Sequence, residues 1–124
     1  MVKNDIKKLK IVYVAGPYRN KNFFKKLKNI FTARKYAKRI WEFGVGAICP
    51  HSNTAFFSEK NNDHILNSYL KIMSNCDAIF VLPDYAFSFG TQEEIKLAEK
   101  LKLPIYYYWQ IETLKYDIEN NKLK

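Results

Sequence analysis

The chain has 124 residues, 48% hydrophobic and 27% charged, which predicts one packed domain over residues 1–124 rather than a disordered chain. No apolar run approaches the ~18 residues that a membrane helix needs, and residues 1–10 are too charged for a secretory signal. Cys49 and Cys76 match neither a zinc spacing nor a disulfide framework. We therefore expect a soluble, cytoplasmic protein that does not bind membranes.

The net charge of +9 is unevenly distributed along the chain. Residues 1–60 hold 14 Lys and Arg against three acids, a net +11, whereas residues 61–124 hold seven Lys against nine acids, a net −2. A basic half of this kind is typical of proteins that bind nucleic acid, a nucleotide or a membrane surface. An AT-rich genome gives the same excess of lysine, so charge alone does not choose between these explanations.

The first half of the chain opens with an apolar, β-branched run over residues 9–15, which predicts a buried strand ending at a Gly-Pro pair. Residues 18–28 are polar and basic, and we expect a loop or a short helical turn. Apolar residues at helical spacing then predict a helix over 29–43, with Gly44 at the position after its C-cap. A second short strand is expected over residues 45–49.

The second half of the chain continues this alternation of helices and strands. After a loop over 51–62, the expected elements are a helix over 63–75, a strand over 78–82, a helix over 91–102, a strand over 104–109 and a last helix over 111–121. Strands that are nearly all apolar and alternate with helices imply a parallel sheet covered on both faces. The expected fold is a three-layer α/β domain.

Ligands of such sheets bind beyond the carboxyl ends of the strands. After the first strand, Gly16 permits close backbone approach and Arg19 can pair with an anion. After the third, Ser88 and Gly90 offer a hydroxyl and backbone N–H groups just before a helix, which suits an anion. The simpler interpretations are a tight turn with a solvated arginine, and an ordinary helix start capped by Thr91.

Glu94 is expected in the first turn of that helix, where its carboxylate can point into the cleft. Glu93 then points elsewhere, because consecutive helical residues diverge by about 100°. Acids near a helix N-terminus are also favoured by the helix dipole, so a purely structural role stays open. Asp77 is expected to be a cap or a buried structural acid, and His51 is more often a hydrogen-bonded loop residue than a catalyst.

Three segments together resemble the nucleoside 2-deoxyribosyltransferase-like superfamily. They are residues 11–19 (IVYVAGPYR), 75–83 (NCDAIFVLP) and 88–98 (SFGTQEEIKLA), and their order and spacing cover about residues 9–108. The resemblance implies a flavodoxin- or Rossmann-like three-layer sandwich with four to five parallel strands, assembled as a homodimer or larger homo-oligomer. It also implies cleavage or exchange of the N-glycosidic bond of a nucleoside or nucleoside 5′-monophosphate, without a metal or other cofactor.

The same resemblance implies roles for individual residues. Glu94 matches the nucleophile that attacks the anomeric carbon and forms a covalent glycosyl-enzyme, and Tyr13 matches the residue that orients its carboxylate. The implied substrate-binding positions are Gly16, Pro17, Arg19, His51, Asp84, Ser88 and Gly90. Of these, Gly16, Arg19, Ser88 and Gly90 match positions that hold a 5′-phosphate, and His51 falls near one that faces the base.

One position departs from the family pattern. Tyr69 stands eight residues before Asp77, where those enzymes often carry an Asp that protonates the leaving base. A phenol with a pKa of about 10 is a poor substitute, which leaves Asp63, His51 or a partner chain as the source of the proton.

Two other functions remain open. The departure at Tyr69 also fits a non-catalytic protein that binds or sequesters a nucleotide-derived ligand. A nucleic-acid-binding module driven by the basic half ranks last, because the sequence contains no recognition motif for DNA or RNA.

Overall fold

The computed structural model describes residues 9–17, 22–50 and 62–123. At its centre lie four parallel strands: β1 (Ile11–Ala15), β2 (Gly46–Ile48), β3 (Ala78–Val81) and β4 (Ile105–Tyr107). Their order across the sheet is β2-β1-β3-β4, so β1 and β3 are the inner pair. Within that sheet, Tyr13 lies level with Ile48 of β2 and Ile79 of β3.

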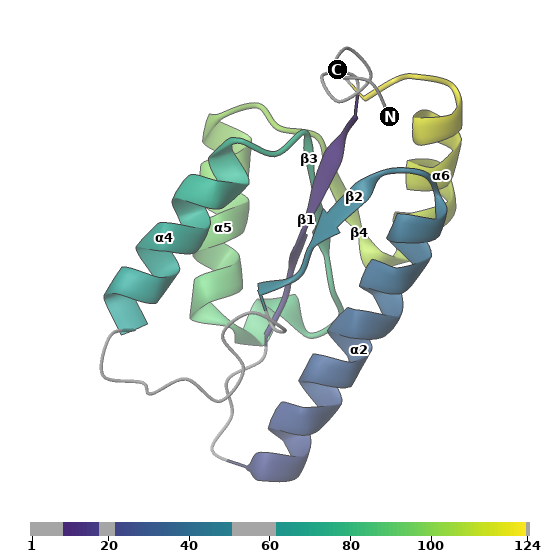
Figure 1. The fold of residues 1–124 in the computed structure, drawn as a ribbon. Coiled ribbons are helices and arrows are strands. Elements are labelled where there is room, and N and C mark those ends of the chain that lie inside the picture. The colour runs from purple at the N-terminus through teal and green to yellow at the C-terminus, as the bar shows by residue number, and fades with distance from the viewer. Residues whose placement is uncertain (1–8, 18–21, 51–61, 124) are drawn as a thin grey trace.

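Two layers of helices cover the sheet (Figure 1). On one face lie α2 (Phe23–Glu42) and α6 (Ile111–Glu119), and on the other lie α4 (Asn62–Ser74) and α5 (Phe89–Lys100). The predicted three-layer α/β fold with a parallel sheet of four to five strands is therefore confirmed, with four strands in the described part of the chain.

The strand period of two divides the core into two parts. Val12 and Val14 of β1 point to the α2 and α6 side, where they join a buried cluster that includes Ile40 and Leu114. Tyr13 and Ala15 point to the other side, into a cluster with residues of α4 and α5. Tyr13 is wholly buried, so its hydroxyl must find a partner inside the protein.

The helix α2 begins six residues earlier than the sequence predicts. Asn22 caps it by accepting hydrogen bonds from the backbone N–H groups of Phe24 at 2.9 Å and Lys25 at 3.2 Å. Phe23 and Phe24 are exposed, so the first turns bury no apolar stripe and give no helical signal. At the other end, Gly44 has φ 93°, the left-handed conformation predicted for it.

Several boundaries in the second half also differ from the prediction by one or two residues, and two of these differences have a clear physical cause. The helix α5 begins at Phe89 instead of residue 91, because Ser88 and not Thr91 is its N-cap. The strand β4 ends at Tyr107, followed by a short 3₁₀ helix, Tyr108–Gln110. There the Gln110 side chain accepts the backbone N–H of Tyr107 at 2.9 Å, so the apolar run up to residue 109 is not all strand.

The strand order also fixes where a ligand can enter. The chain runs from β1 outward to β2 on one side, and then crosses back to β3 on the other side of β1. Crevices in open parallel sheets form at this reversal, beyond the carboxyl ends of the strands. None of the helices in residues 9–17, 22–50 and 62–123 is long and apolar enough to cross a membrane.

Candidate functional site

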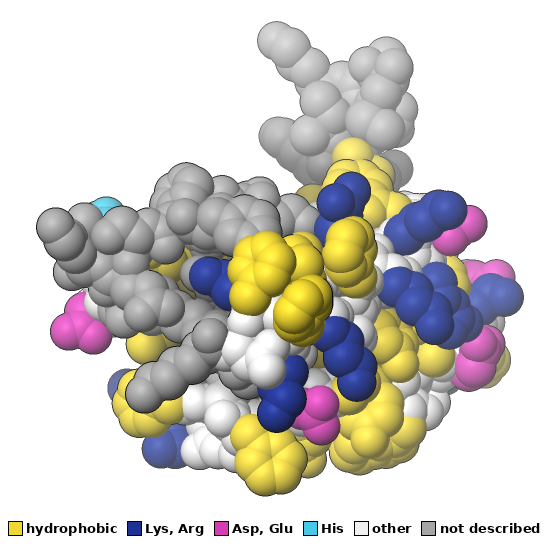
Figure 2. All heavy atoms as spheres, turned by 90° about the horizontal axis from the view of Figure 1, so that it is seen from below, with side chains coloured by type: hydrophobic (Ala, Val, Ile, Leu, Met, Phe, Trp, Pro, Cys, Tyr) yellow, Lys and Arg dark blue, Asp and Glu magenta, His cyan; other side chains and the backbone are white. Residues whose placement is uncertain are grey.

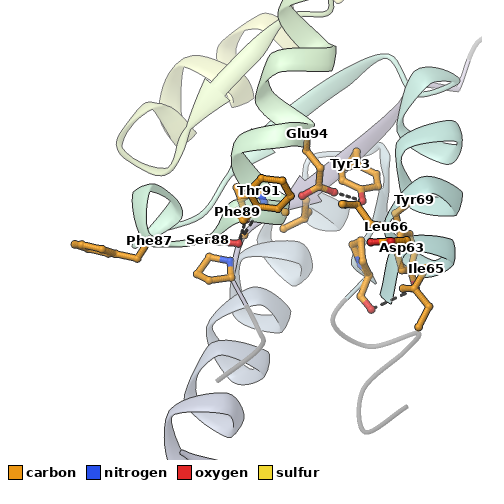
Figure 3. A pocket seen from close by; sticks show the side chains of 15 residues that line it. Tyr13, Asp63, Ile65, Leu66, Tyr69, Phe87, Ser88, Phe89, Thr91 and Glu94 are labelled. Atoms are coloured by element: carbon orange, nitrogen blue, oxygen red, sulfur yellow. Dashed lines mark hydrogen bonds between the residues drawn. The ribbon is translucent and has the colours of Figure 1, made fainter. Parts of the chain in front are cut away.

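A cavity of about 420 Å³ lies beyond the carboxyl end of β1, between α4 and α5 (Figure 3). Its walls come from β1 and the two residues after it, from α4, and from the first half of α5 with the residues before it. The lining residues are Tyr13, Val14, Gly16, Pro17, Pro50, Asp63, Ile65, Leu66, Tyr69, Phe87, Ser88, Phe89, Gly90, Thr91 and Glu94. The size lies within the range of small-molecule sites.

The cavity contains a buried carboxyl group paired with a buried phenol. The Tyr13 hydroxyl of β1 donates a hydrogen bond to Glu94 Oε2 of α5, across 81 positions of sequence (Figure 3). Glu94 is 7% exposed and Tyr13 is 0% exposed. The predicted pairing of these two side chains is thus present, although their chemical roles remain a prediction.

Burial changes how both groups titrate. It raises the pKa of Glu94 from 4.5 to about 7, while the hydrogen bond from Tyr13 acts in the opposite direction. Burial, together with the neighbouring Glu94 carboxylate, raises the pKa of Tyr13 far above its ordinary value. Tyr13 therefore stays protonated and acts as a donor, and Glu94 changes its charge near neutral pH. A buried, perturbed carboxyl group in a cavity is a common mark of catalytic sites.

The neighbouring glutamate lies in a different environment. Glu93 points away from the cavity and forms an ion pair with Lys96 at 3.5 Å, as the helical spacing predicts. Because α5 begins at Phe89, Glu94 lies in the second turn of the helix and not in the first. The dipole effect is confined to the first turn, so it does not account for Glu94 being at this position.

The expected anion-binding segment before α5 lines the cavity. Ser88 caps the helix, and its Oγ accepts hydrogen bonds from Thr91 N at 3.2 Å and Thr91 Oγ1 at 2.9 Å. The segment is therefore a capped helix start, but the capping residue is Ser88 and the expectation of Thr91 in that role is wrong. Gly90 also lines the cavity, and a Cβ there would meet Leu66 only at an ordinary 3.7 Å, so the fold does not require glycine there. Its missing side chain keeps the cavity open.

Gly16 is needed for a different reason. A Cβ on this residue would lie 2.6 Å from both Cβ and Cδ1 of Leu82, so a side chain cannot fit unless the ends of β1 and β3 move apart. Pro17 follows it in the cavity wall. These two residues shape the entrance, and any contact with a substrate remains a prediction.

The helix α4 contributes two further polar groups to the wall. Tyr69 is buried, and its hydroxyl donates to the Pro50 carbonyl at a long 3.5 Å. Asp63, in the first turn of α4, lines the cavity on the side opposite to α5 (Figure 3). Of the three proton sources that the sequence left open, Asp63 is the one that the described structure brings into the cavity.

The remaining expected site residues are not among those that line the described part of the cavity. Arg19 and His51 lie outside the described residues. Asp84 is exposed, with φ 63° before the 3₁₀ helix Tyr85–Phe87, and is not part of the cavity wall. Asp77 is structural, because its Oδ2 accepts the backbone N–H of Ile11 at 2.7 Å. Burial raises the pKa of Cys76 to about 11, which leaves its thiol unreactive.

The apolar wall was not identified from the sequence. Ile65, Leu66 and Phe89 line the cavity, and no motif or spacing in the sequence marked them as part of a binding site. Within residues 9–17, 22–50 and 62–123, no group of three or more His, Cys, Asp or Glu side chains is placed to hold a metal ion.

Comparisons with known proteins agree with this architecture. A family model described as a domain of unknown function, DUF7768, matches residues 10–108. A 2-deoxyribosyltransferase from the psychrotolerant bacterium Bacillus psychrosaccharolyticus has a similar structure, with a TM-score of 0.57 and 20% identity over 78% of this chain and 70% of that one. It is described as a biocatalyst for the synthesis of antiviral and antitumoral nucleosides. No curated protein matches the sequence.

The similarity to this enzyme confirms the expected relationship at the level of the fold. One fold hosts many chemistries, so an activity has to be argued from the residues of the site.

Proposed function

The chain belongs to the DUF7768 family, whose description assigns no activity, and we propose from its cavity that it cleaves or exchanges the N-glycosidic bond of a nucleoside or nucleoside 5′-monophosphate. The observation that carries this proposal is the buried Glu94 carboxyl group, held by Tyr13 at the wall of a cavity of about 420 Å³. The 2-deoxyribosyltransferase with the same fold supports this reaction class.

In the first step, the Glu94 carboxylate attacks the anomeric carbon of the bound sugar. The bond from that carbon to the base nitrogen breaks, its electron pair leaves with the base, and an ester joins the sugar to Glu94. Tyr13 donates to Oε2, which fixes the carboxylate and leaves Oε1 for the attack. Because the phenol stays protonated, it does not compete as a base.

The departing base needs a proton, and we assign its delivery to Asp63. Asp63 and Glu94 are the carboxyl groups in the described part of the cavity wall, and they come from opposite helices. In the second step, Asp63 accepts a proton from water as the water attacks the anomeric carbon and releases Glu94. If a second nucleobase attacks the anomeric carbon in place of water, the result is exchange of the base rather than hydrolysis.

The other walls suit the rest of such a substrate. Leu66 and Phe89 offer apolar surface for a flat base, and the first turn of α5 lies at the wall with its N–H groups, which suits a 5′-phosphate. Substrate choice therefore depends on the residues between α4 and α5.

Base release tests the proposal directly. The protein is incubated with a panel of nucleosides and nucleoside 5′-monophosphates, and free base is separated by chromatography. We expect release by the wild type and a loss on the order of 10⁴-fold in Glu94→Gln. The matched control is Glu93→Gln, which makes the same change one position away, at a half-buried residue outside the cavity wall, and should keep full activity. Release from none of the substrates, or equal loss in both variants, contradicts the proposal.

A non-catalytic binding protein is the second candidate. The observation that favours it is Tyr69, which is buried in the cavity wall where a carboxylic acid is expected. It predicts a rise in melting temperature with one of these ligands, no free base, and the same rise in Glu94→Gln. Thermal shift and chromatography on the same samples separate the two candidates.

A further inference from the structure

A second concave surface lies on the α2 face of the sheet, away from Glu94. It is a groove of about 640 Å³ between α2 and the edge strand β2. We call it the α2 groove, and its characteristic side chains are Phe31, Arg34, Lys35, Lys38 and Trp41 of α2, with Ala47 of β2 beside them. The proposed glycosidic reaction uses none of them.

Helix geometry brings these side chains together. Residues three, four and seven positions apart lie on one side of a helix, and the five α2 residues follow that spacing. The side that carries Ala33 and Ile40 is fully buried against the sheet. The groove residues are therefore turned toward solvent, at the edge where the sheet ends with β2.

The charge of α2 is strongly positive and largely uncompensated. Its sequence, FFKKLKNIFTARKYAKRIWE, contains seven Lys and Arg and one acid. Arg39 pairs with Glu112 at 3.1 Å, but within the described residues Arg34, Lys35 and Lys38 form no ion pair. Seen from the end at which α2 begins, Lys and Arg side chains lie among hydrophobic ones (Figure 2). Such a field attracts an anion with several charges.

Two large aromatic rings lie in the same groove with much of their surface in water. Phe31 is 61% exposed and Trp41 is 58% exposed. They are ten positions apart, roughly 15 Å along the helix axis, and the three cations lie between them. Single-stranded nucleic acid matches this pattern, because its bases stack on aromatic rings while its phosphates contact cations. We propose that the α2 groove binds single-stranded DNA or RNA without sequence preference.

The same features disfavour other occupants. A second copy of the chain, related by a two-fold axis, would place these cations against their own counterparts. The phosphates of duplex nucleic acid could pair with the cations, but its bases are stacked inside the helix and cannot stack on the rings of Phe31 and Trp41. The sequence contains no recognition motif for DNA or RNA, and nucleic-acid binding ranked last for that reason. Binding without sequence preference needs no such motif, so this objection does not exclude it.

Charge variants test the electrostatic part of the proposal. The probe is a fluorescently labelled oligothymidylate of about 15 nucleotides, followed by anisotropy over a salt series. Three contacts predict a log–log salt slope of about −2. Arg34→Gln/Lys35→Gln/Lys38→Gln should weaken binding by about tenfold or more and flatten the slope. The matched control is Lys71→Gln/Lys100→Gln/Lys115→Gln, which removes the same charge from α4, α5 and α6. It should leave the binding affinity and the salt slope unchanged.

The two tryptophans test the stacking part. Trp109 is 60% exposed, nearly the same as Trp41, but it lies outside the groove. The oligonucleotide should quench Trp41 emission in Trp109→Phe and leave Trp109 emission unchanged in Trp41→Phe. Base release by both triple variants should equal that of the wild type, which separates this site from the proposed reaction.

Several results would overturn the proposal. No oligonucleotide binding, an equal loss in both triple variants, or quenching of Trp109 excludes the groove as the site. A groove-dependent change in molecular mass on gel filtration, without oligonucleotide binding, would assign it to self-association. Binding to anionic phospholipid vesicles that is lost in the groove variant, without oligonucleotide binding, would assign it to a membrane surface.

Discussion

The cavity and the α2 groove use charge in opposite ways. In the cavity, a single carboxyl group is withdrawn from water, and its burial raises its pKa to about 7. In the groove, Arg34, Lys35 and Lys38 are exposed to solvent, where charged side chains contribute little to stability. In our two proposals, the first region therefore changes a covalent bond, whereas the second attracts an anionic partner.

This difference limits what the net charge of +9 indicates about the function of the cavity. The surplus of lysine and arginine is concentrated on α2, on the face of the sheet that does not carry Glu94. The described cavity wall contains no Lys, Arg or His. The proposed chemistry thus depends on two acids of this wall, Glu94 and Asp63, and the net charge of the chain says little about it.

The first prediction distinguishes an acid of the cavity wall from a cation of the groove. Asp63→Asn keeps the shape of the side chain but removes its transferable proton, so kcat/KM for base release should fall by about 10³-fold. Lys38→Gln, on the other face of the sheet, should leave kcat/KM unchanged. Nucleosides whose bases leave readily without a proton should be less affected. Wild-type rates for Asp63→Asn on all substrates would exclude it as the proton donor.

A second prediction concerns stability and pH. Because the pKa of Glu94 is raised from 4.5 to about 7 in the folded protein, the folded state binds this proton more tightly than the unfolded state. The resulting stability is fully present below about pH 4.5 and is lost as the pH rises through about 7. Relative to Glu94→Gln, the unfolding free energy of the wild type should fall by roughly 3 kcal/mol over this window.

Urea unfolding at a series of pH values measures this difference. Lys35→Gln, a groove variant with a change of exposed charge, should follow the wild type at every pH. If the plots of unfolding free energy against pH are parallel for the wild type and Glu94→Gln, burial does not raise the pKa of Glu94.

A third prediction compares two glycines of the cavity wall. Gly16→Ala places a Cβ 2.6 Å from the Leu82 Cβ, which no rotamer change relieves, and should lower the unfolding free energy by about 2 kcal/mol. Gly90→Ala meets only Leu66 at 3.7 Å and should fold normally while narrowing the cavity. Thermal unfolding and base release on both variants check this, and equal stabilities would contradict the packing argument.

The smallest effect is expected from Tyr13→Phe. The hydrogen bond from Tyr13 lowers the pKa of Glu94, so its removal raises that pKa and reduces the carboxylate present at pH 7. Base release should fall by about tenfold at pH 7 and recover at higher pH. A pH–rate profile measures the shift, and a loss that is the same at every pH would assign Tyr13 a structural role alone.

The sheet and the central pair of the site could be predicted from the sequence. Apolar runs that stop at Gly16 or before Pro83 are strands for local reasons. The pairing of Tyr13 with Glu94 followed from a resemblance carried by three short motifs, and the structure brings the two side chains together.

Other features depend on contacts that no local pattern encodes. The first turns of α2 are stabilised by the Asn22 N-cap and bury no row of apolar side chains, so hydrophobic periodicity does not reveal them. Asp63 enters the cavity because α4 packs beside α5, and the sequence offered it only as one of three candidates. The α2 groove exists because a helix lies beside an edge strand, and the strand order had to be known first.

Covalent trapping is the most direct test of Glu94 as the nucleophile. A nucleoside with fluorine at the 2′ carbon slows release of the sugar from the enzyme, because the fluorine destabilises the oxocarbenium-like transition state. After incubation, proteolysis and mass spectrometry, we expect one added sugar on Glu94 of the wild type, no added sugar in Glu94→Gln, and the same adduct on Glu94 in Glu93→Gln. Base release without any adduct, or an adduct on another residue, would contradict the assignment of Glu94 as the nucleophile.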